Sequence, residues 1–245
     1  MGRKEKWACI TGAGRGIGAA IALRLAREGY DLLLHYHSSQ NLAETVAAEC
    51  RKEGSEVHLV CADLTSTDGA HELFGKLPFH PDVLILNAGI SQYGVIQDVT
   101  PDEFDKMINI HVRAPFFCAQ QALPHMIRRG YGRIITLSSI WGLAGASCEV
   151  LYSAAKGAVN SFTKALAKEA APSGITVNAV APGMIDTEMI RDQYSAEDID
   201  GIIEEIPAGR MGQSAEIAAL IAFIASEEAG YINGQVISAN GAWYC

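Results

Sequence analysis

Seven short apolar runs alternate with longer amphipathic segments along the whole chain, and this alternation limits the fold more than any other feature. Each run is rich in β-branched residues or leucine, and the seven lie at residues 8–11, 32–36, 57–61, 83–86, 134–137, 176–180 and 235–238. Nearly continuous apolar strands are typical of parallel sheets that are covered on both faces. The alternation therefore predicts an α/β fold, a doubly wound parallel sheet with helices on both faces.

The segments between the runs have the apolar stripes of amphipathic helices. Ile17, Ile21 and Leu25 recur every four residues, and a similar stripe lies within 217–224. The chain has no linker, internal repeat or low-complexity stretch, and 49% of its 245 residues are hydrophobic, enough for a sizeable core. Because α/β folds of this length often form one domain, we expect a single domain over 1–245.

Charge and cysteine usage exclude several classes of function. The 19 Lys and Arg residues face 28 Asp and Glu residues, and a net charge of −9 would be repelled by phosphate backbones, so we expect no nucleic-acid partner. No apolar run reaches the roughly 18 residues of a membrane span, and the apolar stretch after the basic start stops at Gly12. The sequence therefore predicts a cytoplasmic protein. Six scattered cysteines without a Cys-x-x-Cys spacing predict no metal site.

Three irregular stretches, 87–100, 139–151 and 183–213, each follow a predicted strand. In open α/β sheets the ligand lies at the carboxyl ends of the strands. We therefore expect these loops to lie over the functional site.

The segment Thr11–Gly18 joins the first predicted strand to the first helix and holds glycine at Gly12, Gly14, Gly16 and Gly18. Glycine lets the backbone turn sharply and approach a phosphate, and the following helix N-terminus offers free N–H groups to an anion. An ordinary tight turn does not need four glycines in seven residues. The segment therefore predicts a dinucleotide-binding turn, with the spacing Gly-x-x-x-Gly-x-Gly.

The end of the second strand favours NADP(H) as the cofactor. An acid expected there binds the ribose diol of NAD, but residues 35–39 read His-Tyr-His-Ser-Ser. A carboxylate would repel a 2′-phosphate, and its absence, with Arg15 inside the glycine-rich turn, favours contacts from Arg15, His37 and Ser38. The alternative is that Arg15 points to solvent and the His and Ser residues cap a helix.

Tyr152 and Lys156 are spaced to share one face of a predicted helix. A phenol has an ordinary pKa of about 10, and a neighbouring ammonium lowers it by stabilising the phenolate. The pair is a plausible proton donor to a carbonyl oxygen. Ser139, just past the fifth strand, could hydrogen-bond the same oxygen, and Asn109 could hold Lys156 or a water.

In order along residues 6–245, these motifs resemble the short-chain dehydrogenase/reductase family. Asp63-Leu64 matches the pair that contacts adenine in the family, and Asn87-Ala88-Gly89 matches the motif that supports the sheet. Pro182-Gly183, with Ile185 and Thr187, matches the segment that holds the nicotinamide end of the cofactor. The resemblance implies a Rossmann-type sheet of seven parallel strands. It also implies cofactor contacts from Gly12, Gly14, Arg15, Gly16, Ile17, Gly18, His37, Ser38, Asp63, Leu64, Asn87, Ala88, Gly89, Tyr152, Lys156, Pro182, Gly183, Ile185 and Thr187.

The resemblance further implies hydride transfer from a nicotinamide to a ketone by a tetrad of Asn109, Ser139, Tyr152 and Lys156. In that family the tyrosine donates the proton and the serine orients the carbonyl. The lysine binds the ribose and lowers the tyrosine pKa, and the asparagine positions a water. The family also implies a homotetramer.

Within the family the chain looks similar to the 3-oxoacyl-acyl-carrier-protein reductases. Those reductases dock an acidic carrier protein through basic residues at two positions near the cleft. Arg128-Arg129 fits the first position, but Ser173 occupies the second and carries no charge. The loop before the predicted catalytic helix predicts a substrate pocket walled by Trp141, Cys148 and Glu149, together with Ser139 and Tyr152.

That loop is also similar to reductases of the 5-aminopentanone modification on elongation factor P, so Glu149 would receive a cationic group of the substrate. The alternative is that Glu149 caps the coming helix or faces solvent.

Two other classes of function compete with a ketoreductase. A catalytically silent NADP-binding regulator would need the glycine-rich turn but not the intact tetrad. A methyltransferase on a similar sheet would place an acid at the end of the second strand, where position 36 is Tyr.

Overall fold

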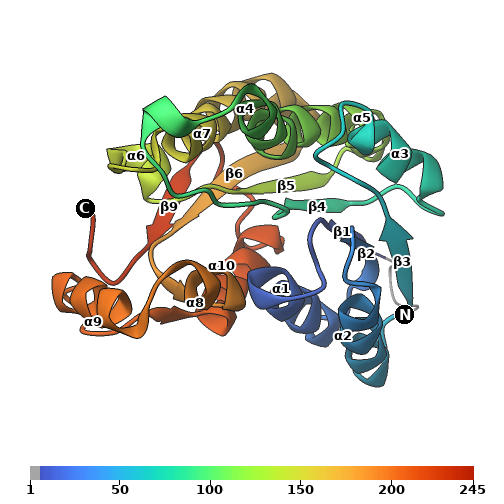
Figure 1. The fold of residues 1–245 in the computed structure, drawn as a ribbon. Helices are drawn as coiled ribbons and strands as arrows, with labels where there is room; N and C mark the ends of the chain where they lie inside the picture. The colour runs from blue at the N-terminus through green and yellow to red at the C-terminus, as the bar shows by residue number, and fades with distance from the viewer. Residues whose placement is uncertain (1–5) are drawn as a thin grey trace.

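The computed structural model describes residues 6–245, which fold around one parallel sheet of seven strands in the order β3-β2-β1-β4-β5-β6-β9 (Figure 1). The strands are β1 (Trp7–Ile10), β2 (Asp31–Tyr36), β3 (Val57–Cys61), β4 (Val83–Leu86), β5 (Gly132–Leu137), β6 (Ile175–Pro182) and β9 (Val236–Ala239). All six pairings in this sheet are parallel. The predicted doubly wound α/β fold is confirmed, with strand ends that differ by one or two residues.

Helices cover both faces of the sheet, as Figure 1 shows. One face carries α1 (Gly16–Arg27), α2 (Gln40–Lys52) and α10 (Ser214–Ala225). The other carries α3 (Gly69–Lys76), α5 (Ala114–Arg129) and α7 (Val150–Ala170).

The core is two apolar clusters, one on each face of the sheet. Neighbouring strand residues point to opposite faces, so Ile10 packs with α1 and α10 while Cys9 packs with α5. Cys9 also pairs in register with Leu33 and Leu84, which belong to the same cluster. Because both faces are buried, most positions of the central strands are apolar, which explains the nearly continuous apolar runs in the sequence.

The structure divides the long helical segment after residue 100. It contains α4 (Pro101–Ile108), a π-helical turn η2 (Asn109–Arg113) and then α5. At the start of α4, Glu103 N–H donates to Thr100 Oγ1 (3.3 Å) and Thr100 N–H donates to the Glu103 carboxylate (2.9 Å). This reciprocal cap satisfies two backbone donors that the first turn of a helix leaves free.

The stretch 183–213 was expected to be irregular, but it contains short elements. They are β7 (Ile185–Asp186), α8 (Glu188–Gln193), α9 (Ala196–Glu205) and β8 (Gly212–Gln213), and β7 pairs with β8 in a separate two-stranded sheet. The other two loops contain η1 (Ile96–Asp98) and α6 (Trp141–Ala144), and η3 (Ala171–Ser173) follows α7. Short helices without a long apolar stripe escape detection by periodicity.

The strand order reverses between β1 and β4, because the chain continues from β1 to β2 on one side and from β4 to β5 on the other. Such a switch point opens a crevice at the carboxyl ends of the strands. The glycine-rich turn, the segment after β2 and the loops after β4, β5 and β6 all meet at this edge.

Within residues 6–245, no helix combines the length and the apolar composition that a membrane span requires. Cys9, Cys50 and Cys118 are buried, as expected of small hydrophobic residues, and burial raises the pKa of the Cys50 thiol to about 11. Cys61 and Cys245 are exposed, and Cys148 is partly buried.

Candidate active site

A cleft of about 420 Å³ lies at the carboxyl ends of the strands. It is lined by all of the predicted cofactor contacts together with Ser139: Gly12, Gly14, Arg15, Gly16, Ile17, Gly18, His37, Ser38, Asp63, Leu64, Asn87, Ala88, Gly89, Tyr152, Lys156, Pro182, Gly183, Ile185 and Thr187. Residues from seven separate segments of the chain therefore meet in one place. Asn109, Trp141, Cys148 and Glu149 do not line this cleft.

The glycine-rich turn is fixed by side chains from β1 and β4. The Asn87 amide donates to the carbonyl oxygens of Thr11 (2.9 Å) and Gly12 (3.0 Å), and Thr11 Oγ1 accepts from Asn87 N–H (2.9 Å). Gly18 must be glycine because an added Cβ would lie 2.1 Å from the Gly12 carbonyl oxygen. Helix α1 begins here with no side-chain cap and no acid in its first turn, so its N–H groups are open to an anion in the cleft.

His35, which the sequence analysis did not assign to the site, holds the same turn from β2. Its Nδ1 accepts from Gly12 N–H (3.0 Å) and its Nε2 lies 3.0 Å from the Ala62 carbonyl oxygen. Because a carbonyl can only accept, the proton belongs on Nε2 and the imidazole is neutral. Burial lowers the pKa of His35 to about 4, so this arrangement persists at neutral pH.

The residues that the sequence predicts to select the cofactor lie at the mouth of the cleft. Arg15 Nη1 is 3.4 Å from Glu188 Oε2 at the start of α8, and both side chains are more than half exposed. The Asp63 carboxylate accepts from Thr65 Oγ1 (2.7 Å) and Thr65 N–H (2.9 Å), which lowers its pKa. Ser39 is the residue before α2, but no serine side chain caps that helix. The capping alternative is therefore wrong for Ser39.

Ser139, Tyr152 and Lys156 meet at the opposite end of the cleft. The Ser139 hydroxyl lies near enough to Tyr152 to lower the pKa of that phenol, and Ser139 Oγ accepts from Trp141 N–H (3.2 Å). Lys156 Nζ donates to the Leu137 carbonyl oxygen (2.7 Å) and lies 5.4 Å from the centroid of the Tyr152 ring. The spacing of four residues does place both side chains on one face of α7.

The expected lowering of the Tyr152 pKa by Lys156 is absent from this structure. Burial, and then the charge of Glu149, raise the pKa of Tyr152, and the hydrogen bond from Ser139 offsets only part of that rise. Burial lowers the pKa of Lys156 to about 7, so its ammonium is only partly populated at neutral pH. Tyr152 is therefore protonated at neutral pH, and in this structure it is a weaker acid than a free phenol.

The Asn109 side chain does not contact Lys156, as the sequence analysis suggested that it could. Its Nδ2 donates to the Thr65 carbonyl oxygen (2.9 Å), so its side chain fixes the loop after β3 and does not contact Lys156. The π-helical turn that begins at Asn109 brings His111 into the cleft instead. The His111 ring meets the Tyr152 ring edge to face at 5.5 Å, and its Nε2 lies 2.7 Å from the Ile90 carbonyl oxygen.

Glu149 is buried, with 6% of its surface exposed, at the residue before α7. Its Oε1 accepts from the Tyr194 hydroxyl (3.1 Å), and no side-chain hydrogen bond caps α7. Burial raises the pKa of Glu149, and among the described residues no cation offsets that rise. The alternatives of helix cap and solvent exposure are therefore both wrong. Sequence reasoning missed Tyr194, which reaches Glu149 from 45 residues away.

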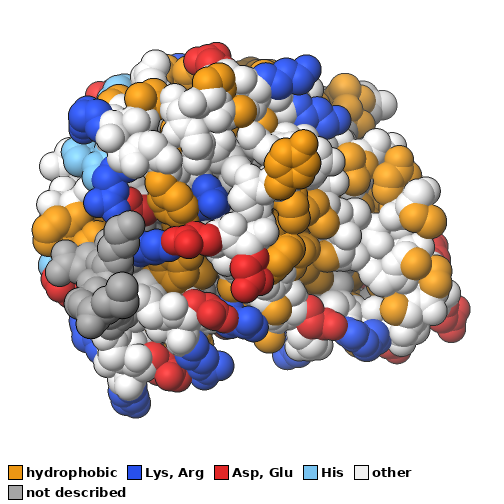
Figure 2. Space-filling model, turned by 180° about the vertical axis from the view of Figure 1, so that it is seen from behind, with side chains coloured by type: hydrophobic (Ala, Val, Ile, Leu, Met, Phe, Trp, Pro, Cys, Tyr) orange, Lys and Arg blue, Asp and Glu red, His pale blue; other side chains and the backbone are white. Residues whose placement is uncertain are grey.

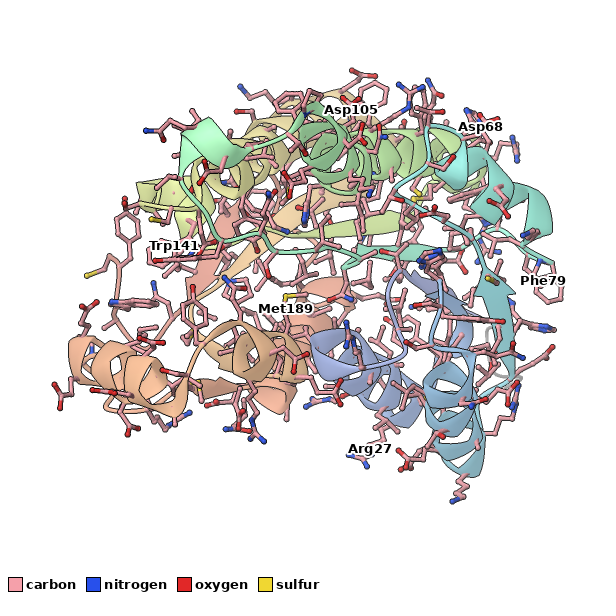
Figure 3. All side chains as sticks on the ribbon, viewed as in Figure 1. Arg27, Asp68, Phe79, Asp105, Trp141 and Met189 are labelled. Atoms are coloured by element: carbon pink, nitrogen blue, oxygen red, sulfur yellow. The ribbon has the colours of Figure 1, made fainter. Side chains whose placement is uncertain are left out.

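Trp141 and Cys148 lie near the cleft but outside its lining. The Trp141 ring packs against that of Trp243 with centroids 5.1 Å apart, so the C-terminal segment contacts α6. Cys148 and Glu149 line a separate, much smaller hollow. Figure 3 shows Trp141 and Met189 extending from α6 and α8 into the space between the two helical layers, and Met189 lines the main cleft.

Arg128 and Arg129 end α5 immediately before β5, at the amino-terminal edge of the sheet. This is the edge opposite the cleft. Arg129 Nε also lies 3.3 Å from the buried Asp82 Oδ1. Within one chain, these residues therefore do not border the cleft as a docking patch.

Comparisons with known proteins agree on one family. The family model described as short chain dehydrogenase matches residues 6–198. The chain is 48% identical to an uncharacterized oxidoreductase, YmfI, of Bacillus subtilis over 242 residues, 98% of this chain and 100% of the relative. It is 40% identical to the 3-oxoacyl-[acyl-carrier-protein] reductase FabG of Staphylococcus aureus over 249 residues, 99% of each chain.

Solved structures of similar fold have bound nicotinamide nucleotides. The angucycline C-6 ketoreductase LanV with bound NADP is 33% identical, with a TM-score of 0.89 over 96% of this chain and 94% of that one. A blue fluorescent protein from a metagenomic library, in complex with NADPH, is 33% identical, with a TM-score of 0.91 over 98% of each chain.

The neutral His35 predicts a loss of stability in acid. Its ordinary pKa of about 6.5 in the unfolded chain exceeds the folded value of about 4, so between these pH values the unfolded chain binds a proton that the folded chain does not. The contribution is complete above pH 6.5 and is lost as the pH falls to 4. It amounts to about 3 kcal/mol in the free energy of unfolding.

Urea unfolding at pH 7, 5.5 and 4.5 measures this loss. His35→Gln can still accept from Gly12 and donate to Ala62, and we expect it to lose less stability in acid than the native protein. The control His80→Gln, at an exposed position, should follow the native pH dependence. An unchanged slope in His35→Gln would show that other groups cause the acid loss.

Proposed function

The chain belongs to the short-chain dehydrogenase family, and from that premise we propose that it reduces a ketone to an alcohol with NADPH. The observation that carries the proposal is one cleft that is lined by a glycine-rich, uncapped helix N-terminus and, at one end, by Tyr152 with the buried residues Ser139 and Lys156. The chain is an oxidoreductase, as its family and its named relatives are.

The lining of the cleft fits NADP(H). The N–H groups of α1 face the position of a pyrophosphate, and the end of β2 has no carboxylate to repel a 2′-phosphate. His37 and Ser38 would contact the adenosine end of the nucleotide, where Asp63 and Leu64 also lie. Lys156 would contact the nicotinamide ribose. When bound, the nucleotide supplies the hydride.

The residues of this chain would supply orientation and a proton. Ser139 and Tyr152 both line the cleft, so a ketone oxygen between them would be held by two hydroxyl donors. The Tyr152 phenol is protonated at neutral pH, the state that a donor to the developing alkoxide needs, and a bound cation near it would offset the rise in its pKa. Asn109 would act by ordering the loop at Thr65, a positioning role.

Two substrates remain candidates. The likeness to the Staphylococcus aureus reductase supports a 3-oxoacyl group on an acyl carrier protein. The buried, cation-free Glu149 supports an amino-ketone such as the 5-aminopentanone modification on elongation factor P. A substrate ammonium would replace the Tyr194 hydroxyl on the carboxylate and remove the cost of its burial. We favour the amino-ketone, because Arg129 is already paired with Asp82 at the far edge of the sheet.

We also propose that the protein acts in the cytoplasm as a homotetramer. Two long helices, α5 and α7, carry exposed apolar residues, including Phe116, which is 49% exposed and packs against Phe162. Phe223 of α10 and the fully exposed Tyr231 lie on another part of the surface. Figure 2 shows hydrophobic side chains gathered near the middle of the face seen from behind. Two apolar surfaces are what a tetramer with two-fold axes needs.

The proposed chemistry predicts that Tyr152→Phe abolishes turnover and keeps NADPH binding. Removing a general acid costs about 10²- to 10⁴-fold in kcat. Ketone-dependent loss of NADPH absorbance measures the rate, and nucleotide fluorescence measures the affinity. Tyr131→Phe is the matched control, because that hydroxyl has no hydrogen-bond partner among the described residues and lies at the amino-terminal edge of β5. A chain that binds NADPH but reduces no ketone, native or variant, would be a silent regulator.

The amino-ketone candidate predicts a selective effect of Glu149→Gln. The amide still accepts from Tyr194, so the fold is kept while the charge is lost. We expect kcat/KM for an amino-ketone to fall about 10- to 100-fold, with an acetoacetyl thioester little affected. Glu197→Gln, at an exposed acid of α9, is the control. Efficient reduction of the acetoacetyl thioester, together with an amino-ketone rate indifferent to Glu149, would instead support the acyl carrier substrate.

The tetramer proposal predicts a mass near four times 26.2 kDa by light scattering at micromolar concentration. Phe116→Glu should shift the protein to a smaller species, because a charge cannot be buried unpaired in an apolar interface. Leu42→Glu, on the exposed side of α2, should leave the mass unchanged. A native protein that runs as a monomer would contradict the proposal.

A further inference from the structure

One chain of hydrogen bonds joins three loops around the cleft. Ser91 Oγ, in the loop after β4, donates to the Gln193 side-chain oxygen (2.7 Å), and the Gln193 amide donates to the Tyr194 hydroxyl (3.4 Å). That hydroxyl donates in turn to Glu149 Oε1 (3.1 Å). Gln193 ends α8 and Glu149 precedes α7, and Figure 1 shows these two helices in opposite layers. The chain of bonds therefore crosses between the layers and ends on a buried carboxylate.

Tyr194 is the neighbour that satisfies Glu149 when no cation is bound. Within residues 6–245, its hydroxyl is the one side chain that donates to this carboxylate. A carboxylate can accept about four hydrogen bonds, and one neutral donor replaces only part of the hydration that burial removes. Burial raises the pKa of Glu149, and the bond from Tyr194 offsets part of the rise. A neutral donor thus occupies a place where a cation would bind more strongly.

Both partners of this bond lie close to the reacting end of the cleft. Glu149 is three residues before Tyr152, and after burial its charge is the next cause of the raised pKa of that phenol. Tyr194 N–H donates to the Ile190 carbonyl oxygen (3.0 Å), and Ile190 lines the cleft together with Tyr152. A ketone at Tyr152 that carries an ammonium a few carbons away is therefore within reach of the bond between Tyr194 and Glu149.

We propose that Tyr194 is a specificity-determining residue, whose hydroxyl occupies the ammonium position on Glu149 and is displaced by a cationic substrate but not by a neutral one. This rests on the proposed amino-ketone substrate. An ammonium has a full charge and three donors, so its bond to a carboxylate is stronger than that of a neutral phenol. The displaced hydroxyl can still accept from the Gln193 amide, which limits the cost of the exchange.

Displacement of the hydroxyl has a consequence that simple addition of an ammonium does not. If the ammonium bound the second carboxylate oxygen and Tyr194 stayed in place, the tyrosine bond would exist in the free and in the bound protein, and its removal would not tighten binding. If the ammonium displaces the hydroxyl, the bond exists only in the free protein. Its removal then destabilises the free protein alone, so the cation binds more tightly.

The test measures the binding of butylammonium and of 1-butanol, an uncharged molecule of similar length, to the NADP⁺-loaded chain without a ketone. Thermal denaturation over a concentration series of each probe gives its dissociation constant. We expect butylammonium, but not 1-butanol, to raise the Tm of the native chain. Tyr194→Phe should lower the Tm in the absence of a probe, and it should bind butylammonium about tenfold more tightly than the native chain does.

Two further variants show whether the effect passes through Glu149. In Glu149→Gln the charge is absent, so adding Tyr194→Phe to it should not tighten butylammonium binding. Tyr231→Phe, at a fully exposed tyrosine, should bind both probes as the native chain does. In ketone assays Tyr194→Phe should lower KM for an amino-ketone with little change in kcat, and leave both constants for an acetoacetyl thioester unchanged. A general structural defect would not separate the two substrates.

A crystal structure of the native chain with butylammonium gives the same answer without a variant, should Tyr194→Phe not fold. A nitrogen within hydrogen-bond distance of Glu149, with the Tyr194 hydroxyl moved away, would support the inference. A hydroxyl that stays on Glu149 in the presence of the amine would overturn it.

The outcomes separate the inference from the proposed function. Butylammonium binding that Tyr194→Phe leaves unchanged or weakens, or a native chain that both probes stabilise equally, would overturn the inference and leave NADPH-dependent ketone reduction standing. Tighter binding in Tyr194→Phe that requires Glu149, in a chain that reduces no ketone, would support the role of Tyr194 and overturn the proposed function alone.

Discussion

The glycine-rich turn depends on hydrogen bonds from the strands on both sides of it. The Asn87 amide, from the end of β4, holds two consecutive carbonyl groups of the turn, and His35, from β2, accepts the N–H of Gly12. These bonds satisfy the carbonyl groups of Thr11 and Gly12 and the N–H group of Gly12. The N–H groups at the start of α1 remain open toward the cleft. A buried neutral imidazole is therefore as much a part of the anion-binding turn as its glycines are.

The other end of the cleft concentrates three ionisable groups that burial disfavours. Glu149, Tyr152 and Lys156 begin or belong to the same helix, and burial is the first cause of the pKa shift in each. Burial favours the neutral form of every group, so the site resists having both a phenolate and a carboxylate. An added positive charge, from substrate or cofactor, lowers the cost of both anions. Among these three groups Lys156 is the one cation, and burial lowers its pKa to about 7.

The sequence predicts the sheet well because both faces of the central strands are buried, so these strands consist mainly of apolar residues. It also predicts which segments meet in the cleft, since parallel strands bring their carboxyl ends together. The contacts that tertiary packing creates could not be predicted. Asn109 bonds Thr65, Arg129 pairs with Asp82, and the π-helical turn that rotates His111 toward Tyr152 has no periodic signal. The Tyr152 pKa depends on the balance between burial, which raises it, and the Lys156 ammonium, which would lower it. A sequence does not show that balance.

Glu149 links the choice of substrate to the direction of the reaction. Its charge is the second cause of the raised Tyr152 pKa, so it keeps the phenol protonated and makes it a weaker acid. Oxidation of an alcohol would need the phenolate, which the same carboxylate opposes. If a substrate ammonium pairs with Glu149, the field of the carboxylate at Tyr152 is partly cancelled, and the phenol releases its proton more easily while that substrate is bound. One buried acid can therefore restrain the proton donor until a cationic ketone arrives, which is a form of selectivity that acts on the rate of proton transfer as well as on binding.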